Sequence, residues 1–172
     1  MRETSQAAIQ GQGHDTRYLR AVLGNVAEVY ETHLGRHDAE LFMAESAYTL
    51  AAELGANAIR KARPGRPTMA HVAREVDTAI AWLDEDVTIA EASDQQMTLL
   101  SPGPSGARSR FMMNLSLFGH IAADALGYVR VVLHESAPGS NEPWKIVIHT
   151  SRTGGGAEFR VWLPAVEEES PP

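Results

Sequence analysis

The stretch RFMMNLSLFGHIAADALGYVRVVLHE, residues 110–135, decides the fold. As far as Leu126 it is apolar on most sides at helical spacing, which is typical of a buried helix. Gly127 ends that helix, and the β-branched run from Val129 to Glu135 predicts a strand. A buried helix followed at once by a strand indicates helices packed on a sheet.

Strands are predicted on both sides of this stretch. Downstream, Trp144 to Thr150 and Glu158 to Leu163 are rich in β-branched and aromatic residues. The linkers at 138–141 and 154–156 are rich in glycine and turn residues, so we expect hairpins or short loops there. Upstream, Val87 to Ala90 and Met97 to Leu100 predict a strand pair before the Pro- and Gly-rich loop at 101–110.

Three helices are predicted before the strands. The first begins at Asp15 or Thr16 and ends at Gly35, the second runs from Asp38 to about Arg60, and the third follows Thr68. We therefore expect an α+β fold, an antiparallel sheet of about five strands with about four helices. The expected order is helix, helix, helix, strand, strand, helix, strand, strand, strand. A single domain over 15–164 would lie between a flexible lead, 1–14, and an acidic tail, 165–172.

Composition excludes several classes of function. The 172 residues are 44% hydrophobic and 22% charged, with a net charge of −7, so we expect a globular domain that does not bind nucleic acid directly. The absence of cysteine excludes disulfides, thiolate–zinc sites and cysteine-ligated clusters. No apolar run approaches the ~20 residues of a membrane span. We expect a cytoplasmic protein without a metal or cofactor.

The segment from Leu117 to Glu135 resembles the closing helix and strand of the 4-vinyl-reductase-like ligand-binding domains. It also resembles the C-terminal sensory domains of some winged-helix repressors. Those relatives often carry Cys-Pro after the strand pair, where this chain has Ser101-Pro102, and a cysteine in the last strand, where Trp144 stands. The resemblance covers about residues 15 to 150. It implies a pocket for a small organic or lipid-like molecule, or a role in protein interaction. Any part in transcription regulation would then need a partner chain.

The last strand has a second, shorter resemblance. Gly154 to Gly156 with Glu158 to Pro164 is similar to the final strand of sensor-kinase ATP-binding domains. No glycine-rich nucleotide boxes precede it, so kinase activity is not expected.

A polar stripe marks the central helix. Ser116, His120 and Asp124 recur every four residues on an otherwise apolar element. Either they form a pocket wall, with Asp124 tuning His120, or they are the solvent edge of a buried helix. A catalytic triad is disfavoured, because side chains on one helix project in parallel.

Aromatic side chains give the remaining candidates for a binding site. They either line a cavity or pack in the core, and the candidates are Tyr48, Trp82, Phe111 and Phe118. His33 and His37 have a metal-binding spacing, but Gly35 between them breaks the helix, so no metal site is predicted.

Three functions remain open at this point. The first is a non-enzymatic small-molecule-binding or sensory domain, with a mostly apolar pocket between helices and sheet for a small hydrophobic ligand. The second is a homodimeric protein-interaction module, suggested by the small residues from Ala44 to Ala58. The third is a small enzyme that uses His120 and Asp124.

Overall fold

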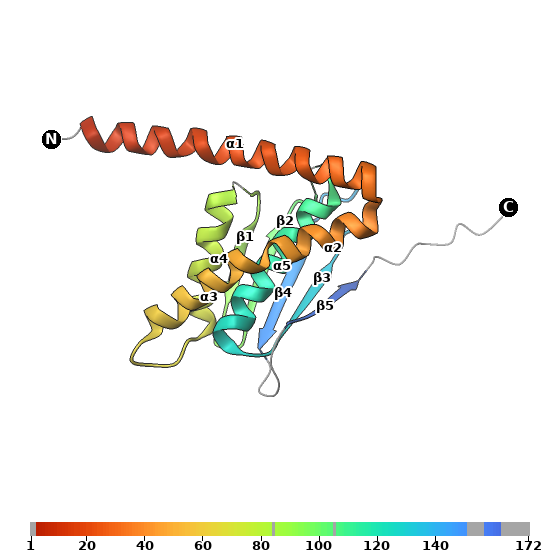
Figure 1. Cartoon of the computed structure of the whole chain (residues 1–172). Helices are drawn as coiled ribbons and strands as arrows, with labels where there is room; N and C mark the ends of the chain where they lie inside the picture. The colour runs from red at the N-terminus through yellow and green to blue at the C-terminus, as the bar shows by residue number, and fades with distance from the viewer. Residues whose placement is uncertain (1–2, 84, 105, 151–156, 163–172) are drawn as a thin grey trace.

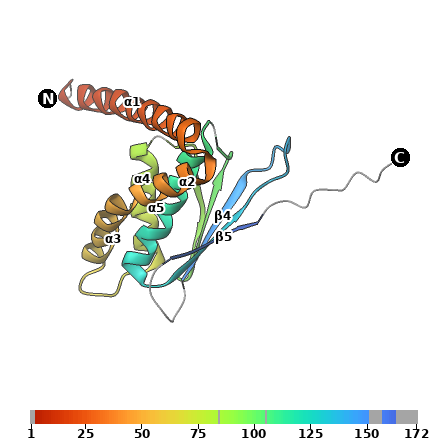
Figure 2. The ribbon, with the colours of Figure 1, turned by 45° about the vertical axis from the view of Figure 1, so that its right-hand side comes forward.

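The computed structural model describes residues 3–83, 85–104, 106–150 and 157–162. It contains the helices α1 (Glu3–Leu34), α2 (Arg36–Ser46), α3 (Tyr48–Ala62), α4 (Met69–Leu83) and α5 (Arg108–Leu126), and the strands β1 (Thr88–Ala92), β2 (Gln96–Ser101), β3 (Val129–His134), β4 (Trp144–Thr150) and β5 (Ala157–Trp162). The helices lie on one side of the sheet (Figures 1 and 2). The predicted α+β class is confirmed.

The helix α5 is the centre of the molecule, as its composition predicts. One side of α5 contacts β3, β4 and β5, and the other side is covered by α2 and α3. Phe118 and Ile121 are completely buried between these layers. Burying a side chain of this size stabilises the fold by about 1.5–3 kcal/mol, so α5 requires apolar residues on almost every face.

The sheet has the order β1-β2-β4-β3-β5 and is mixed. Its pairs are antiparallel except β3 with β5, which is parallel, so the prediction of a wholly antiparallel sheet is wrong. The reason is that β2 and β3 already occupy both edges of β4. The strand β5 therefore pairs with the free edge of β3, and β4 and β5 form no hairpin. The glycine segment between them lies outside the described residues.

The helices differ from prediction in two places. The helix α1 begins at Glu3 instead of Asp15 or Thr16, because the preceding residues contain no proline and include good helix formers such as Ala7 and Ala8. The second predicted helix is interrupted at Ala47 and becomes α2 and α3. With these two counted as one, the predicted order of elements is correct. The predicted acidic tail at 165–172 lies outside the described residues.

Two glycines end helices where the sequence predicts it. Gly35 separates α1 from α2 with φ 82°, and Gly127 follows α5 with φ 91°. Both values are in the region that residues with a Cβ rarely adopt, so each glycine permits a sharp change of direction.

The face of the sheet opposite the helices is polar, and none of the described helices covers it. His134 pairs with Lys145 and His149 with Arg130, so the two histidines do not face each other. None of the helices in the described ranges has the length and hydropathy that crossing a membrane requires.

Candidate functional site

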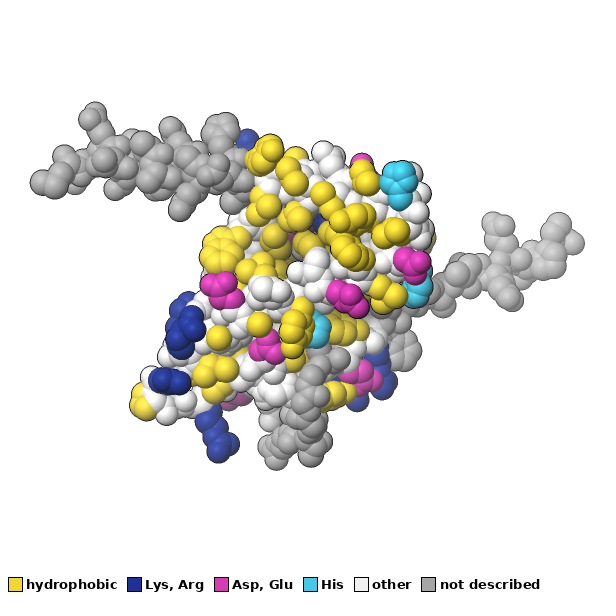
Figure 3. All heavy atoms as spheres, in the orientation of Figure 1, with side chains coloured by type: hydrophobic (Ala, Val, Ile, Leu, Met, Phe, Trp, Pro, Cys, Tyr) yellow, Lys and Arg dark blue, Asp and Glu magenta, His cyan; other side chains and the backbone are white. Residues whose placement is uncertain are grey.

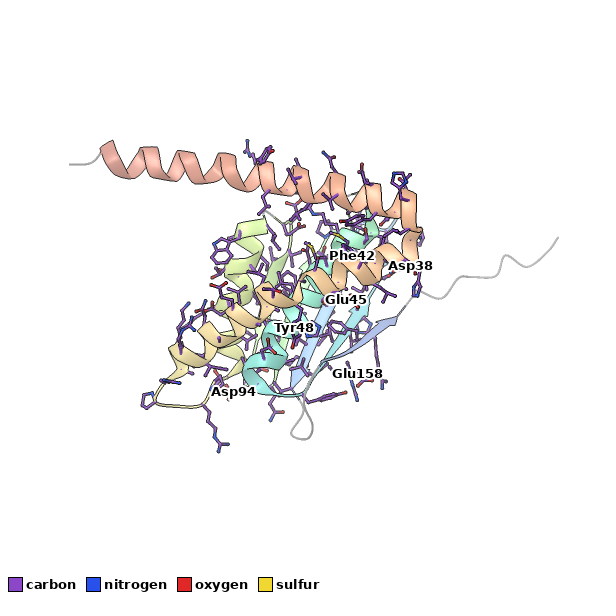
Figure 4. All side chains as sticks on the ribbon, viewed as in Figure 1. Asp38, Phe42, Glu45, Tyr48, Asp94 and Glu158 are labelled. Carbon is purple, nitrogen blue, oxygen red and sulfur yellow. The ribbon has the colours of Figure 1, made fainter. Side chains whose placement is uncertain are left out.

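A groove of about 430 Å³ opens where α2, α3, α5 and β5 meet. Its walls are mostly apolar, and they consist of Leu41, Ala44, Glu45, Tyr48, Ser116, His120 and Phe159. Figure 4 shows Glu45 and Tyr48 along α2 and the start of α3, on the side of the molecule that faces the viewer. Three of the predicted site residues, Tyr48, Ser116 and His120, therefore meet in one groove from helices far apart in the sequence.

The predicted polar stripe on α5 becomes more exposed to solvent from Ser116 to Asp124. Ser116 is buried, and its Oγ donates a hydrogen bond to the backbone oxygen of Ala44 at 2.9 Å, which joins α5 to α2. His120 is half-buried in the groove wall, and Asp124 is exposed one turn further along. No hydrogen bond joins His120 to Asp124 in the described part of the chain, so Asp124 acts on His120 only through its charge.

Three rings from different elements meet around His120. Tyr48 lies edge-on to His120 with ring centroids 5.2 Å apart, and Phe159 is tilted against it at 5.7 Å. Gly119 makes the position of Phe159 possible: a Cβ at Gly119 would lie 2.7 Å from the Phe159 Cζ and 2.8 Å from the Val131 Cγ2. The missing side chain lets the phenyl ring lie directly on the backbone of α5.

The groove is negatively charged. Burial lowers the pKa of His120 below its ordinary 6.5, against the opposing effect of the Asp124 carboxylate, so the imidazole is neutral at pH 7. The exposed Glu45 is the charged member of the lining, and the described lining residues include no lysine or arginine. An apolar surface with negative charge at its rim suits an apolar group that carries positive charge.

The other predicted site residues lie elsewhere. Phe111 is buried and packs edge-on against Trp144 with ring centroids 5.3 Å apart. Phe118 is completely buried between α5 and its neighbours, and Trp82 is half exposed on α4. The core between helices and sheet is filled by such side chains, so the groove opens at the edge of the sheet and not inside the core.

The small residues of the second predicted helix have a different role from the one expected. Ala51, Gly55 and Ala58 of α3 are buried against neighbouring helices of the same chain. A Cβ at Gly55 would lie 2.6 Å from the Asp124 Cβ and 3.3 Å from the Ile121 backbone oxygen, both on α5. These residues bring α3 close to α5 within one subunit, so they do not support a dimer contact.

The helix α1 carries two apolar stripes. One packs on the body of the molecule and includes Leu23 and the completely buried Ala27. The other faces solvent: the exposed fractions are 74% for Tyr18, 37% for Val22 and 52% for Val29. Figure 3 shows hydrophobic side chains gathered over α1 and α2 on the viewed face of the molecule, with only a few charged side chains among them.

A polar cluster at the start of α5 was missed by the sequence interpretation. The Ser109 backbone N–H donates to Glu31 Oε1 of α1 at 2.7 Å. Arg108 pairs with Glu40 of α2 at 3.2 Å and also with Glu135, which follows β3. The Glu31 carboxylate thus accepts from one free N–H at the start of α5, where Ala107 at the N-cap makes no side-chain hydrogen bond. No local motif marks such a cap.

The comparisons add no relatives. No protein-family model matches the chain, and a search of curated proteins found no match. Among the described residues, no group of three or more histidine, aspartate or glutamate side chains is placed to hold a metal ion.

Proposed function

We propose that this chain is a homodimeric protein-interaction module in which the α1 helices of two copies pair with each other. The observation that carries the proposal is the solvent-facing stripe of α1. Tyr18, Val22, Asn25 and Val29 are all exposed and follow one another at intervals of four, three and four residues. This is the repeat by which two helices interlock side by side.

A second copy of the chain is the partner that this stripe fits best. The stripe has no charged member, so two copies meet along it without the repulsion that their net charge of −7 would cause elsewhere. Val22 and Val29 are seven residues apart, the interval at which apolar residues recur along the contact between two paired helices.

The length of α1 also supports pairing between copies. Its 32 residues span about 48 Å, and its N-terminal part runs beyond the rest of the described structure (Figures 1 and 2). A helix that lacks tertiary contacts is only marginally stable in water, so a second helix alongside would stabilise this part. Leu41 and Phe42 of α2 are each about half exposed and add to the apolar surface near the C-terminal half of α1, where Phe42 packs against Tyr30.

Sedimentation velocity at micromolar concentration tests the proposal. The parent chain should sediment as a dimer, and the double variant Val22→Glu/Val29→Glu should sediment as a folded monomer, because each change places a charge in the pairing stripe. Trp82→Glu is the matched control: it introduces the same charge at a similarly exposed large apolar residue, on α4. The control should remain dimeric. A monomeric parent, or a double variant that dimerises as well as the parent, would contradict the proposal.

A small-molecule-binding role is a second candidate function, and the groove around His120 favours it. The groove volume of about 430 Å³ is within the range of known ligand sites, and its lining combines apolar walls with few polar groups. A ligand held by Tyr48 of α3 and Phe159 of β5 would bridge the helical layer and the sheet edge. Such a bridge is one means by which a regulatory module could couple ligand binding to its helices.

A further inference from the structure

We infer that the groove binds an organic ammonium ion, with the aromatic rings of Tyr48, His120 and Phe159 around the cation and Glu45 as its counter-charge. The inference rests on the second candidate function, ligand binding in this groove, and adds the class of ligand.

The arrangement of the three rings favours a cation. The planes of Tyr48 and His120 are 78° apart and those of His120 and Phe159 are 55° apart, so the three rings form walls at steep angles to one another. Aromatic ring faces carry negative electrostatic potential and attract alkylated ammonium groups within about 6 Å. Tyr48 is 54% exposed and Phe159 36% exposed, so neither ring is sealed inside the core.

The charge of the groove lining also favours a cation. Glu45 lines the groove, and the Asp124 carboxylate lies close enough to act on His120, whereas none of the lining residues in the described part of the chain is a lysine or arginine. Arg160 follows Phe159, but its side chain bonds Glu158, with 2.7 Å between nitrogen and oxygen, on the opposite face of the sheet. A neutral imidazole adds no positive charge that would repel a cation.

The Ser116 hydroxyl, which could otherwise bind an anion, is already occupied. The Ser116 hydroxyl donates to Ala44, so it is not available as a donor to a ligand carboxylate or phosphate. The groove thus presents ring faces and one carboxylate, a combination that selects for positive charge on an apolar body.

Gly119 leaves room for the Phe159 ring beside His120. Phe159 lies over the position where a Cβ would stand, which holds the phenyl ring beside His120. Leucine at 159 would keep most of the apolar contact and remove the ring face. Phe159→Leu and Tyr48→Leu therefore separate aromatic attraction from packing.

The experiment compares two probes of nearly equal shape, choline and its neutral isostere 3,3-dimethyl-1-butanol, by NMR titration of the labelled full chain. Choline should shift the amide signals of Tyr48, Ser116 to His120, and Phe159, and should bind about tenfold more tightly than the isostere. Each leucine variant should weaken choline binding by about tenfold and leave isostere binding nearly unchanged. Glu45→Gln should also weaken choline binding, whereas Glu53→Gln, an exposed glutamate on α3 outside the groove, is the matched control and should not.

The outcomes distinguish the ammonium class of ligand from ligand binding in the groove as such. Equal binding of both probes at the groove would refute the ammonium class and retain the groove as a site for apolar ligands. Shifts confined to other surfaces, or no shifts with either probe, would refute both the ammonium class and the ligand-binding candidate. Leucine variants that bind choline as the parent does would refute the role of the rings.

Discussion

Replacing Gly55 by alanine tests the close approach of α3 and α5. The added Cβ would lie 2.6 Å from the Asp124 Cβ, whereas carbon atoms in contact are normally about 3.5–4.0 Å apart. Neither Asp124 Cβ nor the Ile121 backbone oxygen is the end of a flexible side chain, so the two helices must move apart. Overpacking of this kind costs about 1–3 kcal/mol, and alanine returns about 0.5–1 kcal/mol of helix stability. The expected net loss is about 1–2 kcal/mol.

The assay is urea unfolding followed by circular dichroism, at one fixed protein concentration because the proposed subunit pairing would contribute to stability. Gly24→Ala is the matched control: the new Cβ in α1 would meet only the Arg110 Nη1, at an ordinary 3.7 Å. It should stabilise the protein by about 0.5–1 kcal/mol. In a thermal melt, Gly55→Ala should lower Tm by about 2–8 °C. A Gly55→Ala variant as stable as the parent would show that α3 and α5 are not held at this distance.

Two further predictions concern the start of α5 and the groove. Glu31→Ala should cost about 1–2 kcal/mol because the Ser109 N–H loses its acceptor, and Glu31→Gln, which retains an oxygen, should cost less; equal losses in urea unfolding would contradict a capping role. Because burial lowers the pKa of His120 below 6.5, the unfolded chain binds its proton more readily, so His120 should reduce stability as the pH falls below about 6.5. Urea midpoints at pH 7 and 5.5 should therefore differ less in His120→Gln than in the parent. Asp124→Asn should lower the His120 pKa further in an NMR titration, and a raised value would contradict the charge effect. Glu45 and Asp124 are the acids beside this histidine, and both are present in the parent and in His120→Gln.

The sequence predicts the elements of this fold well where one residue pattern has one structural solution. The run from Arg110 to Leu126 is apolar on most sides, and only a helix covered on both sides can bury it. Gly35 and Gly127 mark helix ends because few other residues adopt their backbone angles. Strand pairing, in contrast, does not follow from a local residue pattern. The parallel pairing of β5 with β3 depends on which sheet edge is free, and that is a property of the whole sheet.

The candidate site was predictable only in part, and for a related reason. Helical spacing aligns Ser116 and His120 on one side of α5, but it does not say which side α2 and α3 cover. Phenylalanine is found both in cavity walls and in packed cores. Phe118 and Phe111 prove to be core residues, because burial depends on the neighbours that tertiary packing supplies. Phe159 was not foreseen as a groove residue. The unused signal was Gly119, whose missing side chain marks a close approach on a buried helix.

In the proposed dimer, the two stripes of α1 would have separate roles, one within the subunit and one between subunits. Leu23 and Ala27 attach α1 to its own chain, and Val22 and Val29 point away from that contact, although all four residues follow the same helical period. Sequence periodicity alone merges the stripes into one broad apolar face, which is typical of a fully buried helix. Among the described residues, those that cover α1 pack on the side with Leu23 and Ala27. In the proposed dimer, pairing with a second α1 would bury this exposed stripe.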